Sequence, residues 1–338
     1  MVSVRFSVVS FIFSLTTDHR PLTTLLNMLI VETHATSHIG RVRKGNEDNY
    51  LLLNISGAKA WTSSQDPEEF VIESQRFEVD DSGIVLAVSD GMGGALAGEV
   101  ASQMAVETVS RKFLDDDPDR TISPGEHNNT LIGNLYEATL YANHLIHQQG
   151  RSDPQYQGMG ATFTGIGITP EAVDLIQIGD SRAYLVRSNN IYQITKDQSL
   201  VQQLIDANQI SPEEAETHAL KNVILQALGA QSEIFPVSAR LMPNNNDVIL
   251  LCSDGLSNKI GGVEMQRIVL ENFDHLEMAC VELVKKANEN GGEDNITVIL
   301  AKIAGDALPD PTEGEVRLEL LNIGNIHDTA DQDTAEII

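Results

Sequence analysis

The sequence predicts a domain that contains both β-strands and α-helices. Apolar runs rich in β-formers, such as 84–88 and 248–252, end abruptly at turns that contain aspartate and glycine, as buried strands do. Apolar residues recur at helical spacing in 95–114 and again in 130–149, which indicates two amphipathic helices. With 338 residues, 41% of them hydrophobic, the chain can bury a substantial core as one large domain or two modest ones.

The charge and the cysteines exclude several classes of protein. The formal net charge of −27 argues against binding to a nucleic-acid backbone, which Lys and Arg would have to neutralise, and against binding to an anionic membrane. The two cysteines, Cys252 and Cys280, provide neither a disulfide framework nor a zinc-ligand spacing. We therefore expect buried thiols in a reducing compartment and a cytoplasmic protein with no nucleic acid or membrane partner.

The N-terminal residues differ in character from those that follow. The apolar run 6–15 resembles a short signal peptide, but residues 16–18 lack a small-residue cleavage pattern. The run is also too short to span a bilayer as a helix. We expect residues 1–30 to be a disordered leader or a misassigned start, with the ordered domain beginning near Met28.

The other end of the chain is acidic. Residues 305–338 contain one basic residue, Arg317. Such a composition predicts a flexible tail, with one short helix near 316–323. The expected catalytic domain is therefore 31–304.

Four aspartates lie at the ends of predicted core strands, where glycine-containing turns let backbone carbonyls approach an ion. They are Asp90, Asp180, Asp254 and Asp294. An aspartate in one such turn is usually only a solvated turn residue. Because a sheet can bring several strand ends to one place, four of them predict a shared site for Mg²⁺ or Mn²⁺.

A polar segment at 41–50 separates two apolar strands and contains Arg43, Glu47 and Asp48. One guanidinium and two carboxylates can hold both a phosphate and a cation. Together with the aspartates, and with no Cys or Ser nucleophile paired to a His, they suggest hydrolysis by metal-bound water. Asp90 would then bridge two ions, and Arg43 would hold the phosphate oxygens.

Four further segments have simple interpretations. Residues 57–83 are expected to form a long hairpin insertion or surface loop, and 173–186 a β-hairpin around the turn 179–182. Residues 115–129 form the connector between the two amphipathic helices. The segment 196–229 is expected to be largely helical, with a new helix capped by Ser211.

The motifs taken together resemble the metal-dependent protein phosphatase 2C family, most closely its bacterial single-domain branch. Six motifs occur in the family's order: Arg43 with Asn46 to Asp48, Asp90 to Gly94, Gly158 to Gly160, Gly179 to Arg182, Ser253 to Leu256, and Asp294 to Thr297. The resemblance covers residues 31–304.

The resemblance implies an α+β fold, an α-β-β-α sandwich of two antiparallel β-sheets flanked by helices. It also implies hydrolysis of phosphoserine and phosphothreonine on proteins by a water that bridges two Mn²⁺ or Mg²⁺ ions, with a weaker third ion. The implied partners are phosphorylated proteins and a eukaryotic-like Ser/Thr kinase, and the implied state is a monomer.

The resemblance also implies roles for individual residues. Asp90, Asp254 and Asp294 would hold the first metal, and Asp90 with the Gly91 carbonyl the second. The remaining roles are Glu47 and Asp48 as the catalytic pair around the water shell of the second metal, Arg43 at the phosphate, Asp180 with Asp254 at the third ion, and 198–218 as a flap beside the site.

Three positions depart from the family pattern. Met92 stands where some members have a histidine proposed as general acid, so leaving-group protonation would fall to water or another residue. Gln198 replaces a frequent histidine, and Ala161 replaces a common threonine. Neither Gln198 nor Ala161 occupies the position of a metal ligand in the family.

Two alternatives remain open at this stage. A catalytically silent, phosphoprotein-binding or scaffold domain would be expected to lack one or more of the metal aspartates. A metal-dependent nucleotide phosphodiesterase would be expected to contain basic and aromatic residues for a base, whereas only 5% of the chain is aromatic.

Overall fold

The computed structural model describes residues 29–63, 70–114, 130–311, 316–323 and 335–337. The predicted leader (up to residue 28) and the predicted connector 115–129 lie outside these ranges. Strand β1 (Leu29–His38) begins two residues inside the segment predicted as leader. No helix in the described ranges combines the length and apolar character needed to cross a membrane.

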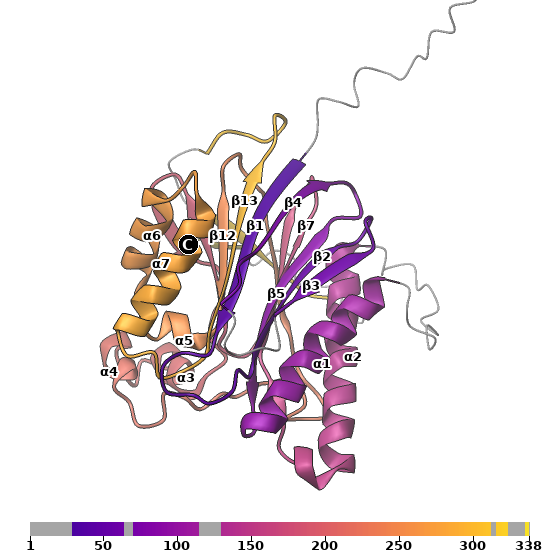
Figure 1. Cartoon of the computed structure of the whole chain (residues 1–338), viewed down its shortest axis with the longest axis vertical. Helices are drawn as coiled ribbons and strands as arrows, with labels where there is room; N and C mark the ends of the chain where they lie inside the picture. The colour runs from indigo at the N-terminus through magenta and orange to yellow at the C-terminus, as the bar shows by residue number, and fades with distance from the viewer. Residues whose placement is uncertain (1–28, 64–69, 115–129, 312–315, 324–334, 338) are drawn as a thin grey trace, which may run out of the picture.

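Two antiparallel β-sheets face each other and form the centre of the molecule (Figure 1). One has six strands in the order β10-β9-β12-β13-β1-β4. Its other five strands are β10 (Asn190–Gln193), β9 (Arg182–Arg187), β12 (Val248–Cys252), β13 (Ile296–Ala304) and β4 (Glu73–Val79).

The second sheet has nine strands, with the order β15-β14-β11-β8-β7-β5-β2-β3 and β6 paired to β5. These strands are β15 (Ala335–Ile337), β14 (Arg317–Leu321), β11 (Val237–Leu241), β8 (Val173–Ile178), β7 (Phe163–Ile168), β5 (Ile84–Met92), β2 (Asp48–Asn54), β3 (Lys59–Thr62) and β6 (Gly160–Ala161).

Helices cover the outer face of each sheet (Figure 1). The predicted helices 95–114 and 130–149 are α1 (Ala95–Phe113) and α2 (Leu131–Ser152), which pack on the nine-stranded sheet. α6 (Gly262–Glu271) and α7 (Leu276–Glu289) pack on the six-stranded sheet. Shorter helices are η2 (Pro154–Tyr156), α3 (Leu200–Asp206), α4 (Pro212–Glu216) and α5 (Asp254–Ser257).

Strand β5 shows why the central strands are apolar at almost every position. Ile84, Leu86 and Val88 point into the core between the sheets, whereas Val85 and Ala87 point into the core beneath α1 and α2. Successive side chains of a strand point to opposite faces, so a strand buried on both faces needs a continuous apolar run. Each fully buried Val, Leu or Ile contributes about 1.5–3 kcal/mol.

The predicted hairpin at 173–186 is wrong. Its two strands, β8 and β9, belong to different sheets, since β8 pairs with β7 and β11, whereas β9 pairs with β10 and β12. The turn between them carries the chain across the sandwich, with Gly179 at φ 101°. Asp180 therefore lies where the chain passes from one sheet to the other.

Three other interpretations need correction. The segment 57–83 contains β3 and β4, which form edges of the two different sheets, in place of a simple insertion. The segment 196–229 has only α3 and α4 as helices, although Ser211 does cap α4 with a reciprocal bond to Glu214. The predicted tail helix is instead strand β14, which pairs with β11 because a free edge of the sheet lies beside it.

Candidate active site

The candidate site begins where β2 and β5 pair at Asp48 and Asp90. The backbone is close-packed there. The Gly91 N–H donates to the Glu47 carbonyl at 3.1 Å, and a Cβ at position 91 would lie 2.1 Å from the Gly98 carbonyl oxygen. Only glycine fits this approach, so packing requires the glycine at position 91.

Asp48 is a buried carboxylate held by two hydroxyl groups. Ser253 Oγ donates to Asp48 Oδ2 at 2.6 Å, and Thr297 Oγ1 donates to the same oxygen at 2.8 Å. Burial raises the pKa of Asp48 to about 7, with the charges of Asp254 and Asp294 adding to the rise and the two hydroxyls opposing it. Asp48 therefore links β2 to the ends of β12 and β13.

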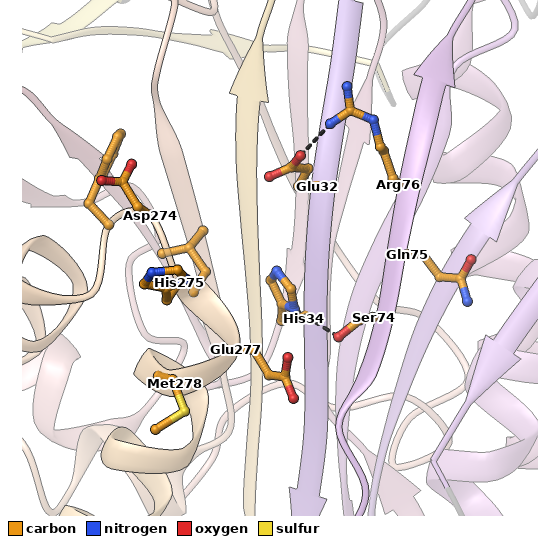
Figure 2. Close-up of a pocket in the computed structure, with 11 residues that line it drawn as sticks. Glu32, His34, Ser74, Gln75, Arg76, Asp274, His275, Glu277 and Met278 are labelled. Carbon is orange, nitrogen blue, oxygen red and sulfur yellow. Dashed lines mark hydrogen bonds and ion pairs between the residues drawn. The ribbon is translucent and has the colours of Figure 1, made fainter.

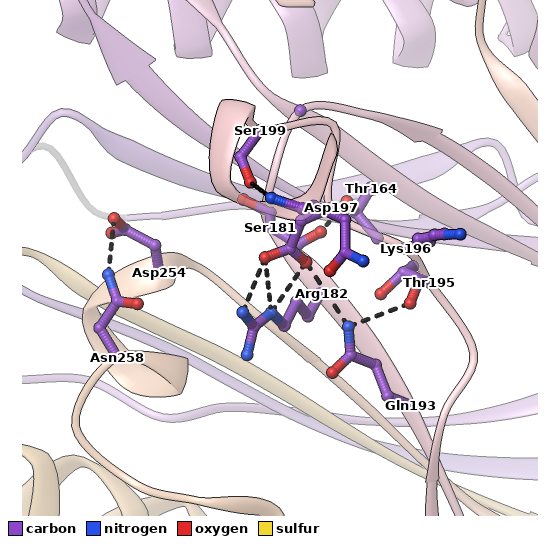
Figure 3. Close-up of polar contacts among 12 residues, drawn as sticks. Thr164, Ser181, Arg182, Gln193, Thr195, Lys196, Asp197, Ser199, Asp254 and Asn258 are labelled. Carbon is purple, nitrogen blue, oxygen red and sulfur yellow. Dashed lines mark hydrogen bonds and ion pairs between the residues drawn. The ribbon is translucent and has the colours of Figure 1, made fainter. Parts of the chain in front are cut away.

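Asp90 and Asp254 lie close together. Burial raises the pKa of Asp90 well above its ordinary value, and the charges of Asp48 and Asp254 raise it further. Burial and the charge of Asp294 raise the pKa of Asp254 to about 6, and hydrogen bonding with Asp90 opposes this rise. Asp254 is the first residue of α5, and Asn258 Nδ2 donates to its Oδ2 at 3.1 Å (Figure 3).

The Arg43 guanidinium lies at the edge of this cluster, about half exposed. Its Nη2 donates to Asp294 Oδ2 at 2.8 Å, and its Nη1 lies 3.7 Å from Glu47 Oε1. Burial raises the pKa of Glu47, although the charge of Arg43 opposes the rise. Arg43 thus serves as counter-ion to two of the predicted site carboxylates.

Asp180 reaches the cluster from the turn between the sheets. Burial raises its pKa to about 7, with the charges of Asp254 and Asp197 adding to the rise. Its Oδ1 is buried and receives no hydrogen bond from the described residues. A buried carboxylate oxygen without a donor is costly unless a cation or a proton compensates it.

Divalent ions fit these residues, whose donors are carboxylate oxygens of the kind that Mg²⁺ and Mn²⁺ prefer. Burial, and after it the charges of neighbouring carboxylates, raise the pKa values of Asp48, Asp90 and Asp180, and a bound cation would favour their ionised forms. Within the described ranges, no three His, Cys, Asp or Glu side chains are already arranged as a ligand set. The structure thus brings the predicted residues together without closing a coordination sphere.

Several residues that organise the site had no predicted role. Asn295 Nδ2 donates to the carbonyls of Ile39 and Gly45, both at 3.0 Å, and its Oδ1 accepts from the Glu47 N–H at 2.9 Å. Thr162 Oγ1 accepts from the Asp90 N–H at 2.9 Å. Ser253, Thr297 and Asn295 stand beside the predicted aspartates in their motifs, which is the one sequence signal that could have drawn attention to them.

Cavities also lie elsewhere. One of about 420 Å³ lies beside β1, β4 and the start of α7, with Glu32, His34, Arg76 and His275 among its lining residues (Figure 2). Another of about 510 Å³ is lined by residues of α2, the segment 232–236 and the end of β14. A third, of about 430 Å³, is lined by the last turns of α2. None of these is lined by a predicted site residue, so the chemistry is expected at the carboxylate cluster.

Comparisons with known proteins identify the family to which the chain is related. A family model described as "Protein phosphatase 2C" matches residues 73–282. The chain is 38% identical over 219 residues to protein phosphatase PhpP of Streptococcus pneumoniae, which covers 65% of this chain and 85% of PhpP. It is also 38% identical over 221 residues to serine/threonine protein phosphatase PstP of Mycobacterium tuberculosis, covering 65% of this chain but 40% of PstP.

A solved structure extends the likeness to three dimensions. The catalytic domain of PstP, in complex with two manganese ions, matches with a TM-score of 0.63 at 32% identity, over 82% of this chain and 99% of that domain. The predicted sandwich of two antiparallel sheets between helices is thereby confirmed. By its sequence and by its fold, the chain belongs to the protein phosphatase 2C family.

Proposed function

We propose that this chain is a metal-dependent phosphatase that removes phosphate from phosphoserine and phosphothreonine in proteins. The observation that carries the proposal is the meeting of Asp48, Asp90, Asp254 and Asp294 at the ends of strands from both sheets, beside one half-exposed arginine. The relatives of the chain are themselves named protein phosphatases, which supports the same conclusion.

The carboxylates would hold two divalent ions. Asp90, Asp254 and Asp294 are the proposed ligands of the first, and Asp90 with the Gly91 carbonyl those of the second. When bound, two such ions lower the pKa of a water molecule and offset the charge that develops on a phosphoryl group. Mn²⁺ and Mg²⁺ both suit these oxygens, and Asp180 with Asp254 would hold a weaker third ion.

The remaining site residues would orient water and substrate. Glu47 and Asp48 would accept hydrogen bonds from the water shell of the second ion. Arg43 would donate its parallel N–H groups to two phosphate oxygens. Its guanidinium lies beside Asp294 and is about half exposed, so a phosphate can reach it from solvent. Met92 has no proton to donate, so the leaving serine or threonine oxygen would take its proton from water or from another residue.

The expected substrates are phosphorylated proteins, and a eukaryotic-like Ser/Thr kinase is the expected partner. Both proposals rest on the family. A monomer is proposed on the same ground, and the buried free thiols of Cys252 and Cys280 support a reducing, cytoplasmic location.

Phosphate release from a phosphothreonine peptide with and without Mn²⁺ tests this function. Wild type should release phosphate only with metal, and Asp90→Asn and Asp254→Asn should each lower kcat by at least about a hundredfold, because ligand loss removes transition-state stabilisation. Asp80→Asn, in an exposed turn, is the matched control.

Two outcomes would contradict the proposal. Wild type that binds Mn²⁺ yet releases no phosphate would favour a silent, phosphoprotein-binding domain. Faster hydrolysis of a phosphodiester than of the phosphopeptide would favour a phosphodiesterase.

A further inference from the structure

We propose that Gln198 is a positioning residue for Asp180, an inference that rests on the proposed function because it concerns the ions of the same site. Gln198 closes a two-way contact with Gly179, the residue before Asp180. The Gln198 N–H donates to the Gly179 carbonyl at 2.9 Å, and the Gly179 N–H donates to Gln198 Oε1 at 2.8 Å. Gln198 therefore bonds both polar backbone groups of Gly179, and the Gly179 carbonyl also accepts from Gln177 Nε2 at 3.3 Å.

Asp180 Oδ1 is buried and receives no hydrogen bond from the described residues, so no donor holds that oxygen in place. The backbone on either side of Asp180 therefore contributes to the position of the carboxylate. Gln198 holds Gly179 on one side, and Thr162 Oγ1 lies 2.7 Å from Ser181 Oγ on the other. A Cβ at position 179 would lie 2.6 Å from Thr162 Cγ2, so the turn is packed as well as bonded.

Gln198 is itself anchored from both directions. Its neighbour Asp197 accepts three hydrogen bonds from Arg182, at 2.9 and 3.2 Å from Nε and 2.7 Å from Nη2 (Figure 3). The Gln198 carbonyl accepts from the Leu225 N–H at 2.8 Å. A bidentate Arg–carboxylate pair restricts geometry more strongly than a single bond. Gln198 is therefore held in place, and its two hydrogen bonds with Gly179 restrain the turn that contains Asp180.

The side-chain amide suits this role. Its oxygen accepts the Gly179 N–H at every pH, and it adds no charge to a site that already contains several carboxylates. An apolar side chain of similar length would leave the Gly179 N–H without its acceptor. The loss of one such hydrogen bond should weaken Mn²⁺ binding at the Asp180 site by about fivefold. Among the metal sites, the effect should appear only at the one that Asp180 helps to form.

A double-mutant cycle measured by calorimetric Mn²⁺ titration of the metal-free full chain tests the proposal. The four proteins are wild type, Gln198→Met, Asp180→Asn and the double variant. Gln198→Met should weaken the weakest Mn²⁺ site by about fivefold in wild type. In the Asp180→Asn background the same change should alter Mn²⁺ binding by less than about twofold. Gln103→Met, which removes a bond to Glu107 in α1, is the matched control and should leave binding unchanged.

Three results would overturn the proposal: equal weakening in both backgrounds, no weakening by Gln198→Met, or unchanged binding in Asp180→Asn. If circular dichroism shows that Gln198→Met does not fold, Gln198→Asn replaces it, because the shortened amide cannot reach Gly179 and should give the same loss. The titration involves no phosphopeptide, so a wild type that binds Mn²⁺ without releasing phosphate would refute the proposed function and leave this inference standing.

Discussion

Asp48 and Asp90 are paired residues of two antiparallel strands, so the backbone itself holds their carboxyl groups side by side. Two like charges in partly desolvated surroundings destabilise the folded chain unless a cation or a proton lies between them. The pairing of these two aspartates therefore lowers the stability of the metal-free protein, and a bound ion would restore it. Such opposition between stability and function is common at catalytic sites.

Asp90→Asn should make the metal-free protein more stable by about 1–3 kcal/mol, because it removes one of the mutually repelling carboxyls. The free energy of urea unfolding in EDTA measures this gain. Asp80→Asn should change it by less than about 0.5 kcal/mol. A less stable Asp90→Asn protein would contradict the electrostatic account.

The pH dependence of stability follows from the same groups. The folded pKa of Asp48 is about 7, above its ordinary 3.8. Between these values the folded protein keeps a proton that the unfolded chain has lost, so this contribution to stability is complete below about pH 4 and is lost as the pH rises through 7.

The comparison that isolates Asp48 is wild type against Asp48→Asn, both metal-free, at pH 5 and pH 7.5. The stability advantage of Asp48→Asn should be larger at pH 7.5. Mn²⁺ should also raise the Tm of wild type more at pH 7.5 than at pH 5, because protons compete for the same oxygens. If the stability advantage of Asp48→Asn were equal at both pH values, Asp48 would not be the group responsible for this pH dependence.

Arg43→Lys should raise KM for a phosphopeptide by about tenfold with a smaller change in kcat, because a lysine cannot bind two phosphate oxygens in parallel. Steady-state kinetics at saturating Mn²⁺ provide the measurement. Arg41→Lys, exposed in the same loop, should leave KM unchanged. A Lys variant with wild-type KM would mean that Arg43 only balances Asp294 and Glu47.

Asn295→Ala should destabilise the protein by about 2–3 kcal/mol, since it leaves the Glu47 N–H and the carbonyls of Ile39 and Gly45 without their partner. Thermal unfolding measures the loss. Asn290→Ala, which removes one exposed bond to the Lys259 carbonyl, should cost less than about 1 kcal/mol. Equal losses in the two variants would show that Asn295 does not organise the loop that carries Glu47.

The sequence predicted where strands and helices lie along the chain better than it predicted which strands pair with one another. Core strands were found because they are buried on both faces, and the aspartates because they end such strands. The hairpin at 173–186 was misread because a tight turn does not reveal which sheet each strand joins. Asp48 meets Ser253 and Thr297 across 205 and 249 residues, a relation that no local pattern encodes. The tail was misread because its acidic composition was given more weight than its pattern. Val316 and Leu318 alternate with charged residues, and this alternation has the period of a strand.

Strand β14 leads to the last prediction. Leu318 is 4% exposed and packs in the core between the two sheets, while β14 pairs with β11. Leu318→Ala should therefore lower the free energy of unfolding by about 2–4 kcal/mol. Glu319→Ala, exposed on the same strand, should cost less than about 0.5 kcal/mol. A flexible tail would make both substitutions neutral in urea unfolding, so a neutral Leu318→Ala would restore the tail prediction and remove β14 from the folded core.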